Sequence, residues 1–389
     1  MLLPDKVREI VARRYRNRRQ EWLTGEEAWP FEVPLGMPDE REAQALPQGL
    51  RAWIDAWQRW SGAGEIVWRE RQWRTLGTQR LPYRLLLPNP ESAAAWLGEG
   101  QRWHRASTRY ARFTLRWPQL RARLSRYFDL LADWDAADID RLETLLGWLE
   151  AHPQSNLYPR QLPLAGLDSK WLEGRMPLIK DLMAVIQNDT GGDLPFYERT
   201  GLRPLPHTVR LCLLHDELRR HTGGLGDITA RLDDLAALDL PASRIFIVEN
   251  LQTGLAFGPH PGAVVFMAMG YGVGALARLP WVLGAACTYW GDLDTHGFAI
   301  LSRARLQLPH LESVLMDETT LLRHRDLWVT EHEQYAADEL PLLTRAEQAV
   351  YSGLKQQRWG GNVRLEQERI PWSYAWENLS QHLGPGTRD

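Results

Sequence analysis

The strongest constraint on the fold comes from apolar runs in the last third of the chain. Residues 244–248, 263–269 and 286–290 are each almost continuously apolar, and helix-length segments such as 273–279 lie between them. Continuous apolar runs are typical of parallel strands that are buried on both faces. Strands that alternate with helices favour an open α/β sheet, whose ligands bind at the carboxyl ends of its strands.

Acidic residues follow two of these predicted strands. Glu249 comes directly after the first, and Asp292 and Asp294 follow the third. Side chains two residues apart on an extended chain point to the same side, and parallel strands end at one edge, so we expect the three carboxylates to converge. Carboxylates are ligands for Mg²⁺ or Mn²⁺, which lower the pKa of a water that attacks a phosphodiester. The alternative is turn chemistry, because Asp readily bonds its own backbone.

Three further residues are candidates for the same site. His296 follows the acids and is a candidate for orienting water or contacting phosphate, although a histidine that packs in a turn is the commoner case. Glu366 and Glu368, two residues apart, are candidate metal ligands or exposed acids of a terminal strand.

The N-terminal region is rich in arginine and tryptophan. Of the 46 basic residues 42 are arginine, and 12 of the 19 tryptophans precede residue 150. Guanidinium groups suit bidentate phosphate contacts and stacking on aromatic rings. Residues 101–128 contain no acid, so this stretch is a candidate DNA-binding surface, with a solvated helix face as the alternative. Its arginines are Arg102, Arg105, Arg109, Arg112, Arg116, Arg121, Arg123 and Arg126.

The patterns divide the chain into three predicted regions. Residues 1–150 are mostly helical by apolar spacing, and residues 241–389 form the predicted sheet. In the middle region, 151–240, two apolar-periodic segments flank a glycine-rich turn. This order is compatible with a helix-turn-helix or winged-helix unit, and equally with any two-helix linker.

Length and composition indicate a soluble multidomain protein. A chain of 389 residues with 44% hydrophobic and 24% charged residues can bury a core in each of its domains. The two isolated cysteines exclude a disulfide scaffold and a cysteine-based zinc motif. The start lacks the apolar stretch of a signal peptide, and no run is long enough to span a bilayer. We therefore expect a cytoplasmic protein without membrane contact.

Five segments of the sequence carry a resemblance to a known family: residues 164–171, 247–250, 289–301, 315–319 and 365–370. They resemble the JetD family, the nuclease subunits of the Wadjet anti-plasmid systems, which are also called MksG or EptD. The resemblance covers nearly the whole chain, more loosely in the N-terminal region. It implies a C-terminal Toprim domain, distantly related to that of the topoisomerase VI A subunit, with Glu249 as the Toprim glutamate and Asp292 and Asp294 as its Asp-x-Asp pair.

The resemblance also implies an activity and partners. A homodimer would cut double-stranded plasmid DNA with Mg²⁺ or Mn²⁺, and would work with a condensin-like SMC ATPase, its kleisin and a small third subunit. Topoisomerase VI cuts with a tyrosine on a domain before Toprim, but this chain has no tyrosine between Tyr197 and Tyr271, so we expect water as the nucleophile. A non-catalytic DNA-binding subunit and a tyrosine-type transesterase are the alternatives.

Overall fold

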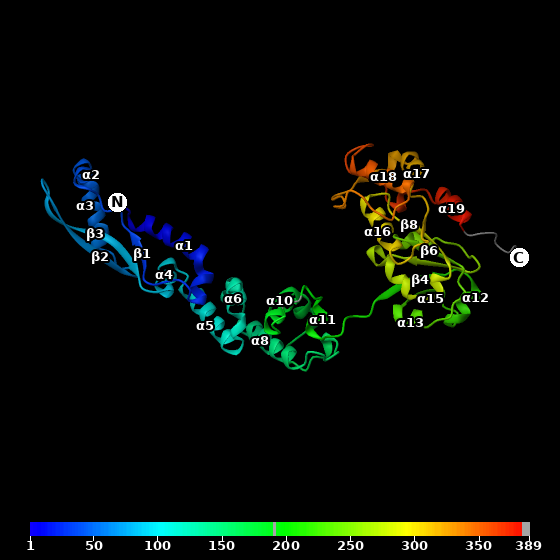
Figure 1. Cartoon of the computed structure of the whole chain (residues 1–389), viewed down its shortest axis with the longest axis horizontal. Helices are drawn as coiled ribbons and strands as arrows, with labels where there is room; N and C mark the ends of the chain where they lie inside the picture. The colour runs from blue at the N-terminus through cyan, green and yellow to red at the C-terminus, as the bar shows by residue number, and fades with distance from the viewer. Residues whose placement is uncertain (190–191, 383–389) are drawn as a thin grey trace. The chain divides into compact units, whose positions relative to one another are not determined.

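The computed structural model describes residues 1–189 and 192–382. Its contacts divide the chain into two compact units, Met1–Leu205 and Pro206–Asp389, each with a buried core of its own (Figure 1). The division falls inside the predicted middle region, 151–240. Residues up to Leu205 pack with the first unit, and the rest of that region packs with the second. None of the helices in the described residues is long and apolar enough to cross a membrane.

The first unit is mainly helical, as predicted, but it also contains a three-stranded antiparallel sheet that the sequence analysis did not predict. The strand order is β1-β3-β2, with β1 at Phe31–Pro34, β2 at Glu65–Trp73 and β3 at Gly77–Leu87. The α-helices are α1 Pro4–Thr24, α2 Glu40–Ala45, α3 Pro47–Gln58, α4 Pro90–Leu97, α5 Gly100–Arg116, α6 Arg121–Leu124, α7 Phe128–Asp133, α8 Ala136–Ala151, α9 Ser169–Glu173, α10 Met176–Ile186 and α11 Phe196–Thr200.

Many of the N-terminal tryptophans form the core of this unit. Trp53 and Trp57 of α3 are almost fully buried, and each donates its indole N–H to the carbonyl of Leu2 at 2.9 Å. Trp103 is also buried and donates to the carboxylate of Glu91 at 3.0 Å. Buried tryptophans need such partners for their N–H groups. The high tryptophan content therefore reflects packing here, and it does not create an exposed stacking surface at these positions.

The second unit is built on a six-stranded mixed sheet of order β5-β4-β7-β6-β8-β9. The strands β7, β6, β8 and β9 run parallel, and β4 and β5 add an antiparallel edge. The strands are β4 Thr208–Leu213, β5 Asp227–Arg231, β6 Arg244–Val248, β7 Ala263–Met267, β8 Ala286–Trp290 and β9 Glu312–Ser313, with a separate pair β10 Val329–Thr330 and β11 Val363–Arg364. The α-helices are α12 Asp216–Arg219, α13 Leu232–Ala236, α14 Leu251–Leu255, α15 Pro280–Leu283, α16 Thr295–Arg305, α17 Glu318–Arg323, α18 Arg345–Lys355 and α19 Trp372–Gln381.

The three predicted strands of this unit are confirmed as β6, β7 and β8. They pair in parallel and are buried on both faces, which explains why no alternation marks them in the sequence. The segment 273–279 lies in a 3₁₀ helix, Gly270–Arg278, instead of an α-helix.

The prediction of a helix-turn-helix or winged-helix unit before the sheet is wrong. Its first predicted helix begins as β4, which pairs with β7 inside the sheet, and its second begins as the edge strand β5. Residues Leu211–Leu214 are all buried in the core of the second unit, so both faces of the sheet are covered here. Such a run fits a buried strand as well as a buried helix, so apolar periodicity alone misassigned it.

Candidate functional site

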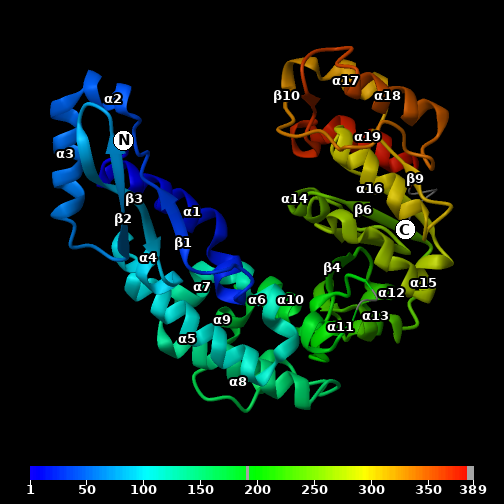
Figure 2. The same ribbon diagram turned by 60° about the vertical axis from the view of Figure 1, so that its left-hand side comes forward.

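The carboxyl ends of β6 and β8 bring the predicted acids together. The two strands are parallel neighbours in which Val248 pairs with Trp290, so the residues that follow them emerge side by side. Glu249 follows β6, while Asp292 and Asp294 lie in the short turn between β8 and α16, drawn in yellow in Figures 1 and 2. We call Glu249, Asp292 and Asp294 the strand-end site.

Glu249 is held by groups from β8 and the turn after it. Its carboxylate accepts hydrogen bonds from the Tyr289 hydroxyl and from the backbone N–H of Asp292. The pKa of Glu249 is raised to about 7, chiefly by burial; the Tyr289 hydrogen bond lowers it, and the negative charges of Asp292 and Asp294 raise it. A Cβ at Gly291 would overlap the Glu249 carboxylate and the Tyr289 hydroxyl, so glycine is needed for this approach.

Asp294 caps the helix that follows the site. Its side chain accepts the N–H of Gly297 at 2.7 Å and is 6% exposed. The pKa of Asp294 is raised to about 6, chiefly by burial; the Gly297 hydrogen bond lowers it, and the charges of Glu331 and Asp292 raise it. Aspartate is a preferred N-cap residue, so this geometry combines the turn chemistry with a position beside the other acids. For the Asp-x-Asp pattern, turn chemistry and metal binding are therefore compatible interpretations.

A guanidinium lies among these carboxylates. Leu293 and Leu365 form an antiparallel bridge, which places Arg364 beside both aspartates. The Arg364 side chain bonds Asp292 at 2.6 Å and forms an ion pair with Asp294 at 3.1 Å. It thus offsets part of the negative charge of the clustered carboxylates.

The predicted metal ligands Glu366 and Glu368 flank the site, and the residue between them points into it. Gln367 is 1% exposed, donates its backbone N–H to Asp292 at 2.7 Å, and donates its side-chain amide to the carbonyl of Trp290 at 2.7 Å. Glu366 pairs with Arg369 at 2.6 Å and approaches Arg364 at 3.7 Å. Glu368 accepts from Asn250 at 2.5 Å.

His296 turns toward different partners. Its Nδ1 lies 2.7 Å from the Tyr271 hydroxyl, and its Nε2 lies 3.2 Å from the carbonyl of Glu333. These contacts link the start of α16 to the segments that contain Tyr271 and Glu333. The catalytic role of His296 stays a prediction.

Sequence reasoning missed a fourth acid beside the site. Glu331 is 3% exposed and accepts hydrogen bonds from the backbone N–H and hydroxyl of Thr295 at 3.1 and 2.6 Å through one oxygen. Its other oxygen is buried without a hydrogen-bond partner among residues 1–189 and 192–382, and the charge of Glu331 raises the pKa of Asp294. No local pattern around residue 331 indicates this position, because only the fold brings it to α16.

The chemistry of these donors suits a hard divalent cation, since the site offers carboxylate oxygens and one of the nearby oxygens lacks a partner. In their present positions, however, no three His, Cys, Asp or Glu side chains among residues 1–189 and 192–382 are arranged to hold a metal ion together. Arg364 lies between Asp292 and Asp294 instead.

The arginines of residues 101–128 are mostly bonded within the first unit. Arg105 donates to the carbonyl of Ala132, and Arg109 donates to the carbonyls of Leu131 and Trp134. The other contacts are Arg102 with Glu99, Asp129 and Asp133, Arg112 with Asp140 and Glu143, Arg116 over Trp117, Arg121 with the carbonyl of Thr24, and Arg123 with Asp181. We call Arg102, Arg105, Arg109 and Arg112 the α5 arginine cluster. DNA binding by these residues and by Arg126 stays a prediction.

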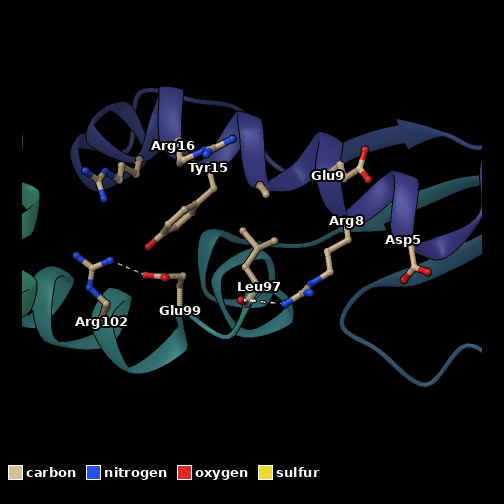
Figure 3. Close-up of a pocket in the computed structure, with 10 residues that line it drawn as sticks. Asp5, Arg8, Glu9, Tyr15, Arg16, Leu97, Glu99 and Arg102 are labelled. Carbon is tan, nitrogen blue, oxygen red and sulfur yellow. Dashed lines mark hydrogen bonds and ion pairs between the residues drawn. The ribbon is translucent and has the colours of Figure 1, made fainter.

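Charged groups that are bonded within the first unit also line a hollow of about 660 Å³ between α1 and the α4–α5 segment (Figure 3). Arg102 binds Glu99 there, and Arg8 donates to the carbonyl of Leu97. The Tyr15 hydroxyl points into the hollow, and burial raises its pKa to about 12. Acidic and basic groups alternate along the walls, so the hollow does not present a surface of one charge.

Two family models match the chain, and no curated protein does. Residues 4–184 match an N-terminal domain described as an uncharacterized protein conserved in bacteria (DUF3322), and residues 201–379 match the C-terminal domain of the Wadjet protein JetD. Together the matches leave only residues 1–3, 185–200 and 380–389 uncovered. The chain therefore belongs to the JetD family of Wadjet proteins.

Proposed function

We propose that the chain is a divalent-metal-dependent DNA endonuclease with a Toprim-type active site at the strand-end site. The observation that carries the proposal is the excess of negative charge there. The guanidinium of Arg364 pairs with Asp292 and Asp294, while Glu249 and the buried Glu331 add two further carboxylates beside these aspartates. Buried like charges repel, so such a cluster is stable only when a cation is bound or protons are taken up.

The residues have separate roles in this proposal. Glu249, Asp292 and Asp294 would hold Mg²⁺ or Mn²⁺, and the bound ion would lower the pKa of an attacking water and polarise the phosphodiester. Gln367 orients Asp292 through its backbone N–H, and Tyr289 orients Glu249 through its hydroxyl. Glu249 is the candidate for accepting a proton. Glu366 and Glu368 lie at the rim, where they are candidates for additional contacts to the metal.

The proposed substrate is double-stranded plasmid DNA, cut as part of a Wadjet defence complex. Membership of the JetD family supports this setting, in which an SMC ATPase, a kleisin and a small third subunit are the expected partners. A homodimer would place one site on each strand of a duplex. Contacts mainly to phosphates would suit a nuclease that cuts plasmids of any sequence.

Water is the proposed nucleophile in preference to a tyrosine. Tyr289 is the tyrosine that contacts the strand-end site, but it is fully buried and its hydroxyl is bonded to Glu249. Burial also raises its pKa well above the usual value. A covalent protein–DNA adduct after cleavage would contradict this part of the proposal.

The test is cleavage of supercoiled plasmid by the full chain together with its partner subunits, in Mn²⁺ or Mg²⁺. Glu249→Gln and Asp294→Asn should reduce cleavage by at least ~10²-fold, the loss typical of removing one electrostatic catalytic group. Glu217→Gln is the matched control, because Glu217 is an exposed acid on α12 of the same unit. Full cleavage by both site variants, with DNA binding retained, would favour the non-catalytic alternative.

A further inference from the structure

We propose that the β2–β3 hairpin of the first unit is a DNA-contacting surface, with arginines that engage duplex phosphates. The outer part of this hairpin is a ribbon free of a third strand, although Trp73 and Leu81 on one of its faces are buried in the core of the unit. β1 pairs only with residues 84–87 of β3, so Trp68–Trp73 and the facing part of β3 extend beyond the third strand. At about 3.4 Å per residue, the free part is roughly 20 Å long. α3 lies beside the hairpin in Figures 1 and 2.

The charge of the ribbon is basic and unmatched. Residues 68–82 contain four arginines and one acid, Glu70, for a formal charge of +3. All four arginine side chains are exposed, and in the described part of the chain none of them pairs with a carboxylate; they are Arg69, Arg71, Arg74 and Arg80. Exposed guanidinium groups that have no carboxylate partner remain available for phosphate oxygens.

The hairpin arginines differ in this respect from the α5 arginine cluster. There, Arg102 and Arg112 each bind two or more carboxylates, and Arg105 and Arg109 satisfy backbone carbonyls. If such a guanidinium moved to a DNA phosphate, its carboxylate or carbonyl partners would become unpaired, and this cost would offset much of the free energy gained from the phosphate contact. The hairpin arginines have no such cost, so they are the better candidates for DNA contact.

The tip of the hairpin is held in a fixed conformation from outside. The carboxylate of Glu40, in the first turn of α2, accepts the backbone N–H groups of Arg74, Thr75 and Leu76. These bonds occupy the Glu40 carboxylate with backbone donors, so the Arg74 side chain is not paired with it. A pre-ordered tip loses little conformational entropy when it binds.

Aromatic rings support two of the arginines. The Arg80 guanidinium lies over Trp68, 5.5 Å from the ring centroid, and the Arg69 guanidinium lies over Tyr83 at 4.9 Å. In the strand register, Trp68 faces Pro82 and Arg69 faces Leu81, so these two arginine–aromatic pairs lie on opposite faces of the ribbon. A two-stranded ribbon can enter the major groove, and the exposed arginine side chains at its two edges can then reach phosphate oxygens.

The inference concerns DNA binding and is separate from cleavage. The test therefore uses the full chain carrying Glu249→Gln, a fluorescent duplex and EDTA, so that no metal or hydrolysis is needed. The hairpin variant is Arg71→Gln, Arg74→Gln and Arg80→Gln combined. The control combines Arg51→Gln, Arg160→Gln and Arg203→Gln, three exposed arginines of the same unit without carboxylate partners among the described residues.

The hairpin variant should weaken duplex binding at least about tenfold and should reduce the slope of log K against log salt by up to about 2.7, at about 0.9 for each phosphate contact. The control variant should change both quantities little, and both proteins should keep the melting temperature of the parent. Equal losses in the two variants, or unchanged binding by the hairpin variant, would overturn the inference. Because this experiment measures no cleavage, failure of this inference is distinguishable from failure of the nuclease proposal.

Discussion

The strand-end site and the α5 arginine cluster are both dense in charge, but they are balanced in different ways. Each guanidinium of the α5 arginine cluster is bonded to carboxylates or carbonyls of the same unit. At the strand-end site several acids face one guanidinium, Arg364, and a buried oxygen of Glu331 lacks a partner. Balanced charges stabilise a fold by themselves, whereas an excess of buried charge indicates a missing ligand.

A balanced pair inside the second unit gives a reference for this comparison. Arg305 and Glu347 are 9% and 6% exposed and form two hydrogen bonds, at 2.6 and 2.9 Å. Glu347 also accepts from Ser313. The pair links α16 to α18, so it is structural and lies apart from the proposed chemistry.

The largest effect is expected from breaking this pair. Glu347→Gln leaves the buried Arg305 without its counterion, which should lower the free energy of unfolding by about 3–5 kcal/mol. Urea unfolding measures the change. If the variant were as stable as the wild type, the Arg305–Glu347 pair would not stabilise the fold. It could then not serve as the balanced pair with which the strand-end site is compared.

The same pair predicts a dependence on pH. Burial alone would raise the pKa of Glu347, but the hydrogen bonds from Arg305 and Ser313 outweigh it and lower the pKa to about 2. Because the folded-state pKa lies below the unfolded value, the stabilisation is complete above about pH 4.5 and is lost as the pH falls toward 2. The stability difference between wild type and Glu347→Gln should therefore shrink over this range, and a constant difference would contradict the assignment.

A smaller effect is expected from crowding the strand-end site. A Cβ at Gly297 would overlap the backbone carbonyl of Asp292, so Gly297→Ala should shift the turn that carries Asp292, cost about 1–3 kcal/mol of stability and abolish cleavage. Gly284→Ala is the matched control, since a Cβ there meets open space. Thermal unfolding and plasmid cleavage of both variants check this, and equal behaviour would contradict it.

The role of Arg364 makes the comparison sharper. If its guanidinium competes with a metal for Asp292 and Asp294, Arg364→Met should raise the affinity for Mn²⁺ about tenfold, or about 1.4 kcal/mol. Calorimetric titration measures this directly. Arg369→Met is the control, because Arg369 pairs with Glu366 and not with the aspartates. Unchanged or weaker Mn²⁺ binding by Arg364→Met would show that Arg364 does not compete.

The smallest effect is expected at the surface of the α5 arginine cluster. Arg112 is 41% exposed and pairs with Asp140 and Glu143. Exposed ion pairs contribute about 0–1 kcal/mol, so Arg112→Gln should change the free energy of unfolding by less than about 1 kcal/mol. A larger loss measured by urea unfolding would contradict this and would mean that the ion pairs of the cluster contribute strongly to the stability of the fold.

The sequence supports prediction where the signal is local. The strands 244–248 and 286–290 were recognisable from apolar runs, and their acids meet because parallel strands end at one edge. β4 was misassigned because burial on both faces removed the alternation that marks a strand.

Other features depend on distant contacts that no local pattern reveals. Arg364 reaches the aspartates through the bridge of Leu293 with Leu365, and Glu331 reaches α16 through Thr295. In the same way, a run of arginines shows its charge but not its partners. The carboxylates that bind Arg102 lie partly on a later helix, α7.

The central claim is that the strand-end site holds a divalent cation in place of the Arg364 guanidinium. A crystal structure of the full chain grown with Mn²⁺ tests it most directly through the anomalous signal of the metal. The account predicts a manganese peak among Glu249, Asp292 and Asp294, with Arg364 displaced from the two aspartates. Manganese bound elsewhere, with Arg364 still between Asp292 and Asp294, would contradict it.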